Sequence, residues 1–299
     1  MNVIVRPVFN RPEMLYLALK YEQKAREHFD DDYFTIFAVD HGTCAKCFDI
    51  IKDYKYKCIV VARPVRYKVC ANIMEAFKQA FKTDIEYAIN MEDDLILHKS
   101  YFEFVNKAHN LIRDKKYSVL TTWGYSNSGD PNILKCSDYS CGPGTVISKD
   151  FFTKYMMPYT NAGYYNNWVS TIQKINALNQ DNPNAKYSIK LGNQFTHLDW
   201  DGLMNRMVDY ASFSSGVRGY SSLCYRLLHI GFYGFNRHGG KFPAELSTFE
   251  ERVDFLEKGI YNPDVLAELD GVYKDYSTFN PEVDNWSGTL VLEDQEINA

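Results

Sequence analysis

Three consecutive acidic residues, Glu92, Asp93 and Asp94, interrupt an apolar stretch that reads INMEDDLIL. Each negative charge makes its neighbours harder to ionise, and burial at the end of an apolar strand adds to this cost. A bound cation removes the cost, and carboxylate oxygens are the ligands that Mn²⁺ and Mg²⁺ prefer. The cluster therefore predicts a Mn²⁺ or Mg²⁺ site. Alternatively, the acids stabilise the N-terminus of the next helix, but we expect that helix to begin near Ser100.

Two further acids, Asp199 and Asp201, flank Trp200 in HLDWDGLMNRM, just before a predicted helix. A carboxylate beside an indole ring can have a raised pKa, which suits a general base. The alternative, with near-equal weight, is that either acid caps the helix. As a general base we favour Asp201, with Asp199 second.

Strand-like and helix-like segments alternate through the first part of the chain. Strand candidates cover residues 2–9, 33–40, 58–64 and 85–91, and segments with helical spacing of apolar residues cover 12–28, 43–54 and 69–81. This alternation predicts a Rossmann-like α/β fold with a mixed, mainly parallel sheet flanked by helices. Ligands of such sheets bind beyond the carboxyl ends of the strands. Arg11, Asp40 and the three acids follow strand ends, so we expect them at one crevice.

The second half of the chain is less regular. We expect a helix over 101–114, a strand over 118–125, a turn into a strand over 142–148 and a short helix over 149–156. The last 55 or so residues are expected to pack on the outside of the domain, without forming a domain of their own.

Charge and composition restrict the class of protein. The 299 residues carry a net charge of -5, with 14 acids and 3 bases in 244–299 and 7 bases and 3 acids in 185–243. No run approaches the roughly 20 apolar residues of a membrane span, and the N-terminus does not read as a signal peptide. The seven scattered cysteines favour free thiols over disulfides or zinc. We therefore expect a cytoplasmic protein.

The segment INMEDDLILHKSYFEFVNKAHNLI resembles the acidic-motif segment of metal-dependent GT-A glycosyltransferases, and in particular the N-acetylglucosaminyltransferase I family (family 13). Ser100 replaces an aspartate of the family's pattern. Segments before and after this one also resemble the corresponding segments of the family, and they occur in the same order. The resemblance spans roughly residues 3–168 at low identity. The residues and segments that carry it are Tyr67, Lys68, Gln79, Phe81, Tyr101, Phe102, Glu103, TTWGYSN and GPGTVISKDFF.

The resemblance implies a role for each matching residue. Arg11 and Asp40 would contact the nucleotide of a sugar donor, and Glu92 and Asp93 would touch its ribose or support the metal. Asp94 would be a direct ligand of Mn²⁺ or Mg²⁺, and the ion would also bind the donor's phosphates. In LCYRLLHIGFYGFNRHGG, which resembles a later segment of GT-A domains, Arg226 and Arg237 would meet the diphosphate and His229 would bind the metal; a core position for His229 is about equally expected.

One part of the family's pattern is missing. Where the family has the acidic general base, this chain has Asn166 and Asn167, and an amide does not accept a proton at neutral pH. Either Asp201 or Asp199 supplies the base of an inverting reaction, or the reaction is retaining and uses no such base.

We therefore expect a metal-dependent glycosyltransferase that moves a sugar from a nucleotide-sugar donor to a hydroxyl group. The expected donor is a UDP-sugar. The domain would cover 1–243, with a donor half at 1–125 and an acceptor half at 126–243, and the acidic segment 244–299 would pack on it. The acceptor would be a glycan or a hydroxymethylated DNA base of a phage, in a bacterial or virus-infected cell. A nucleotidyltransferase and a non-catalytic nucleotide-sugar-binding protein remain alternatives, although PVFNRPEM lacks the Gly-rich phosphate loop of the former.

Overall fold

The computed structural model describes ten stretches of the chain: residues 1–29, 32–123, 129–137, 143–158, 207–208, 211–212, 215–231, 242–262, 279–282 and 286–293. Within them, nine strands form one mixed sheet in the order β11-β7-β9-β6-β8-β4-β1-β2-β3. No helix in these stretches is long and apolar enough to cross a membrane. The α/β class and the mixed, mainly parallel sheet flanked by helices are confirmed.

The first half of the chain builds the parallel part of the sheet. Its strands are β1 (Asn2–Val8), β2 (Tyr33–Val39), β3 (Cys58–Ala62) and β4 (Tyr87–Asn90), and the helices between them are α1 (Pro12–Glu27), α2 (Ala45–Lys52) and α3 (Lys68–Ala80). Strand β1 pairs in parallel with both β2 and β4, and β2 pairs in parallel with β3. Every element expected here from the sequence is confirmed within two or three residues of its ends.

The second half extends the sheet with short strands. These are β6 (Val119–Thr121), β7 (Ile133–Ser137), β8 (Val146–Ser148) and β9 (Gly219–Ser222). Strand β8 lies between β4 and β6 and is antiparallel to both, while β6 and β9 are parallel. The expected strand over 118–125 is therefore real but shorter, and the strands β7 and β9 were not expected.

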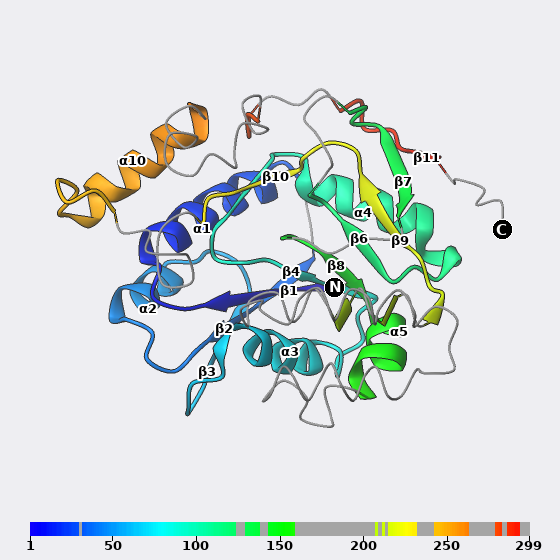
Figure 1. Cartoon of the computed structure of the whole chain (residues 1–299), viewed down its shortest axis with the longest axis horizontal. Helices are drawn as coiled ribbons and strands as arrows, with labels where there is room; N and C mark the ends of the chain where they lie inside the picture. The colour runs from blue at the N-terminus through cyan, green and yellow to red at the C-terminus, as the bar shows by residue number, and fades with distance from the viewer. Residues whose placement is uncertain are drawn as a thin grey trace, which may run out of the picture.

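Helices cover both faces of the sheet (Figure 1). Helix α3 and the short helices α5 (Lys149–Phe151) and η2 (Phe152–Met156) cover one face, while α1 and α4 (Tyr101–Ile112) lie on the other. Neighbouring residues of β1 show this division, since Val3 and Val5 belong to the core around α3 and Ile4 to the core around α4. Strands buried on both faces favour apolar residues at successive positions, which explains the apolar run Val3–Ile4–Val5 of β1.

A second, two-stranded sheet lies at the carboxyl end of β4. It pairs β5 (Leu95–Leu97) with β10 (Leu227–His229) in antiparallel fashion, with His229 opposite Leu95. Strand β5 stands between the three acids and α4, whose N-cap is Ser100. The acids therefore do not stabilise the N-terminus of α4, and that alternative is wrong.

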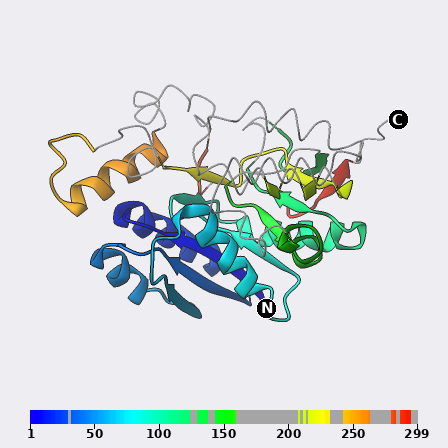
Figure 2. The ribbon, with the colours of Figure 1, turned by 60° about the horizontal axis from the view of Figure 1, so that its bottom comes forward.

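The acidic end of the chain packs on the domain in two described places. Helix α10 (Phe249–Tyr261) begins with a capping box between Thr248 and Glu251, and it contacts α1 through an ion pair of 2.7 Å from Lys20 Nζ to Glu257 Oε1. Figure 2 shows α10 beside α1. Strand β11 (Val291–Glu293) pairs in parallel with β7 at the edge of the sheet. The expected domain boundaries remain a prediction.

Candidate functional site

The acidic residues lie in the turn that connects β4 to β5. Asp93 and Asp94 are buried there, with 2% and 1% of their surface exposed. Arg11, the N-cap residue of α1, donates from Nη1 to Asp94 Oδ2 at 2.6 Å and from Nη2 to Asp93 Oδ1. Arg11 and the acids are thus brought together at the carboxyl ends of β1 and β4, as expected at one edge of a parallel sheet.

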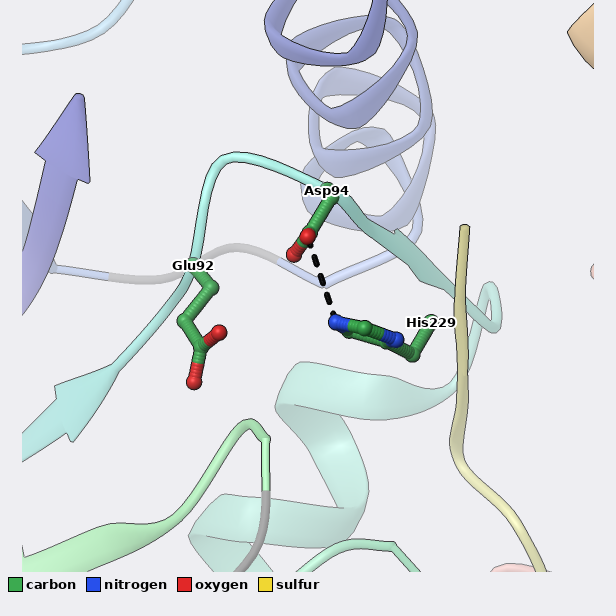
Figure 3. Close-up of side chains that lie close together, drawn as sticks. All are labelled: Glu92, Asp94 and His229. Carbon is green, nitrogen blue, oxygen red and sulfur yellow. Dashed lines mark ion pairs between the residues drawn. The ribbon is translucent and has the colours of Figure 1, made fainter. Parts of the chain in front are cut away.

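His229 reaches the acids through the pairing of β5 with β10. The Ile230 amide donates to the Asp94 carbonyl oxygen at 2.9 Å, which extends the ladder past His229. This places His229 Nε2 3.2 Å from Asp94 Oδ2. Figure 3 shows Glu92, Asp94 and His229 pointing into one space, with the Asp94–His229 contact drawn as a dashed line. The segment 227–229 therefore supplies the histidine from far along the chain.

The three side chains have the geometry of a metal-binding group. One ligand atom from each of Glu92, Asp94 and His229 lies within 4.8 Å of the other two. Asp94 Oδ1 is buried and has no hydrogen-bond partner among the described residues. Two carboxylates and an imidazole form a donor set that suits Mn²⁺, and an unsatisfied buried carboxylate oxygen is costly without a ligand. The residues present therefore fit a divalent cation.

Electrostatics at the cluster agree with this fit. Three carboxylates lie against the single guanidinium of Arg11, so two negative charges would be uncompensated if all three were ionised and His229 were neutral. Burial, followed by the charge of Asp94, raises the pKa of Glu92 to about 7. Burial also raises the pKa of Asp93, whereas Arg11 and His229 outweigh burial at Asp94 and hold its pKa well below the usual range. Asp94 is thus ionised and ready to bind a cation.

Gly231 lies against the same pair of side chains. A Cβ atom at this position would be 2.2 Å from Asp94 Oδ2 and 2.7 Å from His229 Cε1, so any larger residue must displace them. From the sequence, Gly231 was only one of the glycines that follow His229 and favour a ligand role for it. The close packing of Gly231 against Asp94 and His229 could not be predicted from the sequence, because it depends on the pairing of β10 with β5.

Arg6 fixes the start of the acidic turn from within the sheet. Its side chain is fully buried in β1, where Nη2 forms an ion pair of 2.5 Å with Glu22 Oε2 of α1. Its Nη1 donates to the carbonyl oxygen of Glu92 at 2.6 Å. An arginine within an otherwise apolar strand could have indicated a buried ion pair, but the sequence analysis did not consider Arg6.

Trp123, which belongs to the segment TTWGYSN, stacks on His229. The ring centroids are 6.3 Å apart and the planes are inclined by 25°. The indole ring therefore limits the orientations of the imidazole ring.

Asp40 lies at the end of β2, as expected, but its carboxylate is engaged by the backbone. It accepts hydrogen bonds from the amides of His41, Tyr67 and Lys68 at 2.9, 2.7 and 2.9 Å. Lys68 has a φ of 62°, a left-handed conformation that these bonds help to hold. In the described structure Asp40 therefore organises the start of α3, and its contact with a nucleotide remains a prediction.

Arg226 points to a different part of the molecule from His229. Its guanidinium carbon lies 4.5 Å from the ring centroid of Phe104 and 5.2 Å from that of Trp286, and Nη2 donates to the carbonyl oxygen of Pro131. None of these partners belongs to the metal-binding group. The structure thus gives Arg226 packing contacts, and its role toward a diphosphate remains a prediction.

The remaining site residues expected from the sequence lie outside the described stretches. They are Asn166, Asn167, Asp199, Asp201 and Arg237. The general base therefore remains a prediction.

Comparison with known proteins gives weak likenesses only. No family model matches the chain, and no curated protein matches it. A crystal structure of S. aureus TarS 1-349 shares 12% identity over 51% of this chain and 48% of that chain, with a TM-score of 0.39, and TarS 1-349 has also been solved in complex with UDP-GlcNAc. The mannosyltransferase PcManGT from Pyrobaculum calidifontis, in complex with GDP-Man and Mn²⁺, shares 8% identity over 51% of this chain and 46% of that chain, with a TM-score of 0.38.

This chain thus spans about half the length of the solved structures that it matches. Likenesses this weak leave the function to be argued from the site itself.

Proposed function

We propose that this protein is a metal-dependent glycosyltransferase that transfers a sugar from a nucleotide-sugar donor, a UDP-sugar by our expectation, to a hydroxyl group. The observation that carries the proposal is the group of Glu92, Asp94 and His229 at the carboxyl end of β4, with ligand atoms within 4.8 Å of one another. Such strand ends are where open α/β sheets bind nucleotides. Mg²⁺ and Mn²⁺ sites that use few protein carboxylates typically complete their shell with substrate phosphates.

Each residue has a role in this reaction. Asp94, Glu92 and His229 hold Mn²⁺ or Mg²⁺, and Arg11 faces the donor from the N-terminus of α1. The bound ion would act as a Lewis acid on the leaving diphosphate. Asp201, or else Asp199, would remove the proton of the acceptor hydroxyl in an inverting reaction. A retaining reaction would not need that base.

The narrower parts of the proposal rest on sequence alone. They include membership of the N-acetylglucosaminyltransferase I family, the nucleotide contacts of Asp40, the diphosphate contacts of Arg226 and Arg237, and the support of the metal by Asp93. The acceptor is proposed to be a glycan or a hydroxymethylated DNA base, and the domain to cover residues 1–243.

Binding and donor hydrolysis test the proposal. The protein is incubated with UDP- and GDP-sugars in Mn²⁺ or EDTA, and nucleotide release and thermal stabilisation are measured. We expect one donor to stabilise the protein only with metal, and Asp94→Asn to abolish the effect. The control is Asp114→Asn, because Asp114 is 95% exposed and distant from the cluster in sequence.

Three outcomes would contradict the proposal. If Asp94→Asn responds to the donor as the unchanged protein does, the cluster is not the site. If no nucleotide sugar has an effect with either metal, a nucleotidyltransferase becomes the better hypothesis, and nucleoside triphosphates are tested next. Metal-dependent binding without any turnover would favour a non-catalytic binding protein.

A further inference from the structure

Arg11 already compensates negative charge of the acidic turn directly beside Asp94. Its guanidinium bridges Asp93 and Asp94, and its own exposure is only 14%. Arg11 is thus a counter-ion of the acidic turn.

One carboxylate oxygen of Asp94 contacts both Arg11 and His229. Asp94 Oδ2 accepts from Arg11 Nη1 at 2.6 Å and lies 3.2 Å from His229 Nε2. The other oxygen, Oδ1, has no hydrogen-bond partner among the described residues. A divalent cation held by Asp94 and His229 would therefore lie next to the guanidinium, and two positive charges at such a distance repel strongly in a buried site.

We propose that Arg11 and the divalent cation compete for Asp94, and that a diphosphate relieves this competition by giving Arg11 a new anionic partner. This inference rests on the proposed function, because it assigns the diphosphate to the donor. A guanidinium binds phosphate oxygens with the same paired geometry that it uses with carboxylates. Arg11 then couples the two ligands: the metal binds weakly alone and tightly together with a nucleoside diphosphate.

The test compares Mn²⁺ affinity in the unchanged protein and in Arg11→Met, by calorimetry and by the electron paramagnetic resonance signal of free Mn²⁺. With Mn²⁺ alone, we expect the variant to bind roughly tenfold more tightly or better, because one positive charge is removed beside the site. We expect UDP to increase Mn²⁺ affinity much more in the unchanged protein than in the variant. A structural role of Arg11 would instead weaken Mn²⁺ binding in the variant.

Arg252→Met is the matched control. Arg252 pairs with Glu13 at 3.2 Å on the outside of α1 and does not touch the acidic turn. Its loss should leave Mn²⁺ affinity unchanged with and without UDP.

The outcomes separate this inference from the function on which it rests. Equal or weaker Mn²⁺ binding by Arg11→Met, with normal binding by the unchanged protein, overturns the competition and leaves the metal site in place. Absence of Mn²⁺ binding in both proteins, even with UDP, overturns both.

If Arg11→Met folds poorly, Mn²⁺ should raise its melting temperature more than that of the unchanged protein, since the ion replaces the lost charge. Arg11→Lys, which keeps the charge but cannot bridge both acids, should bind Mn²⁺ more tightly than the unchanged protein. Failure of both effects also overturns the competition.

Discussion

The buried side chain of Arg6 donates a hydrogen bond of 2.6 Å to the main-chain carbonyl oxygen of Glu92. The first strand thereby holds the first residue of the acidic turn without using any carboxylate of the cluster. Arg6 depends in turn on Glu22, whose side chain is also fully buried. The position of the turn is therefore set by an ion pair between β1 and α1.

Replacement of Arg6 by Met should destabilise the protein strongly. The change leaves Glu22 as a buried charge with fewer partners, and breaking such a pair typically costs about 3–5 kcal/mol. The free energy of unfolding, measured in urea, should show this loss. Arg6→Met combined with Glu22→Gln should recover part of it, and a loss below about 1 kcal/mol in the single variant would contradict the assignment.

Gly231→Ala should damage the proposed metal site more than the fold. The new methyl group would displace Asp94 and His229, so we expect Mn²⁺ affinity to fall about tenfold or more. Calorimetric titration with Mn²⁺ measures this change. Gly216→Ala is the control: it has a φ of 69° but nothing within 4 Å of a Cβ, so it should cost about 1 kcal/mol of stability and leave Mn²⁺ affinity unchanged.

His109 should make the protein less stable in mild acid. Burial lowers its pKa from 6.5, and the partly opposing effect of Glu86 does not restore it. The unfolded chain therefore binds a proton more readily than the folded protein, so stability is lost as the pH falls through about 6.5. Unfolding in urea at pH 7.5, 6.5 and 5.5 measures the loss.

His109→Gln should remove this part of the pH dependence while keeping a polar group near Tyr117, which lies 2.9 Å from His109 Nδ1. Identical losses between pH 7.5 and 5.5 in both proteins would show that other groups are responsible.

Arg226→Met should weaken the fold, and its effect on UDP affinity tests the proposed diphosphate contact. The variant loses the contacts with Phe104 and Trp286 and the bond to Pro131, together about 2–4 kcal/mol. Unfolding in urea and titration with UDP in the presence of Mn²⁺ measure the two effects. A large fall in UDP affinity would support the diphosphate contact of Arg226, and an unchanged UDP affinity would contradict it.

The first half of the fold could be predicted because its signals are local. Each strand is a run of apolar residues, each helix has apolar residues at helical spacing, and their alternation fixes a parallel sheet. The acidic turn followed from the same logic, since it comes directly after β4. The short strands β7, β9 and β10 carry no such signal, because three to five residues hold too few positions for a period to show.

The partners within the site could be predicted only in part. Arg226 and His229 lie in the same strand-like segment and are both plausible ligands by type. Only the register of β10 against β5 decides that His229 meets Asp94, and register depends on residues far apart in the chain. The place of Glu92 and Asp94 at the end of a buried strand could be predicted from the sequence, whereas the close approach of Gly231 could not.

The long separation of His229 from Asp94 also bears on protein synthesis. Residue 229 follows residue 94 by 135 positions, so at ~5–20 residues per second a ribosome needs about 7–27 s to make the chain between them. During this interval the nascent chain already contains Arg11, which can neutralise Asp93 and Asp94. The imidazole needed to complete the metal-binding group is made only afterwards. A metal ion captured by the nascent acids before that time would lack this ligand.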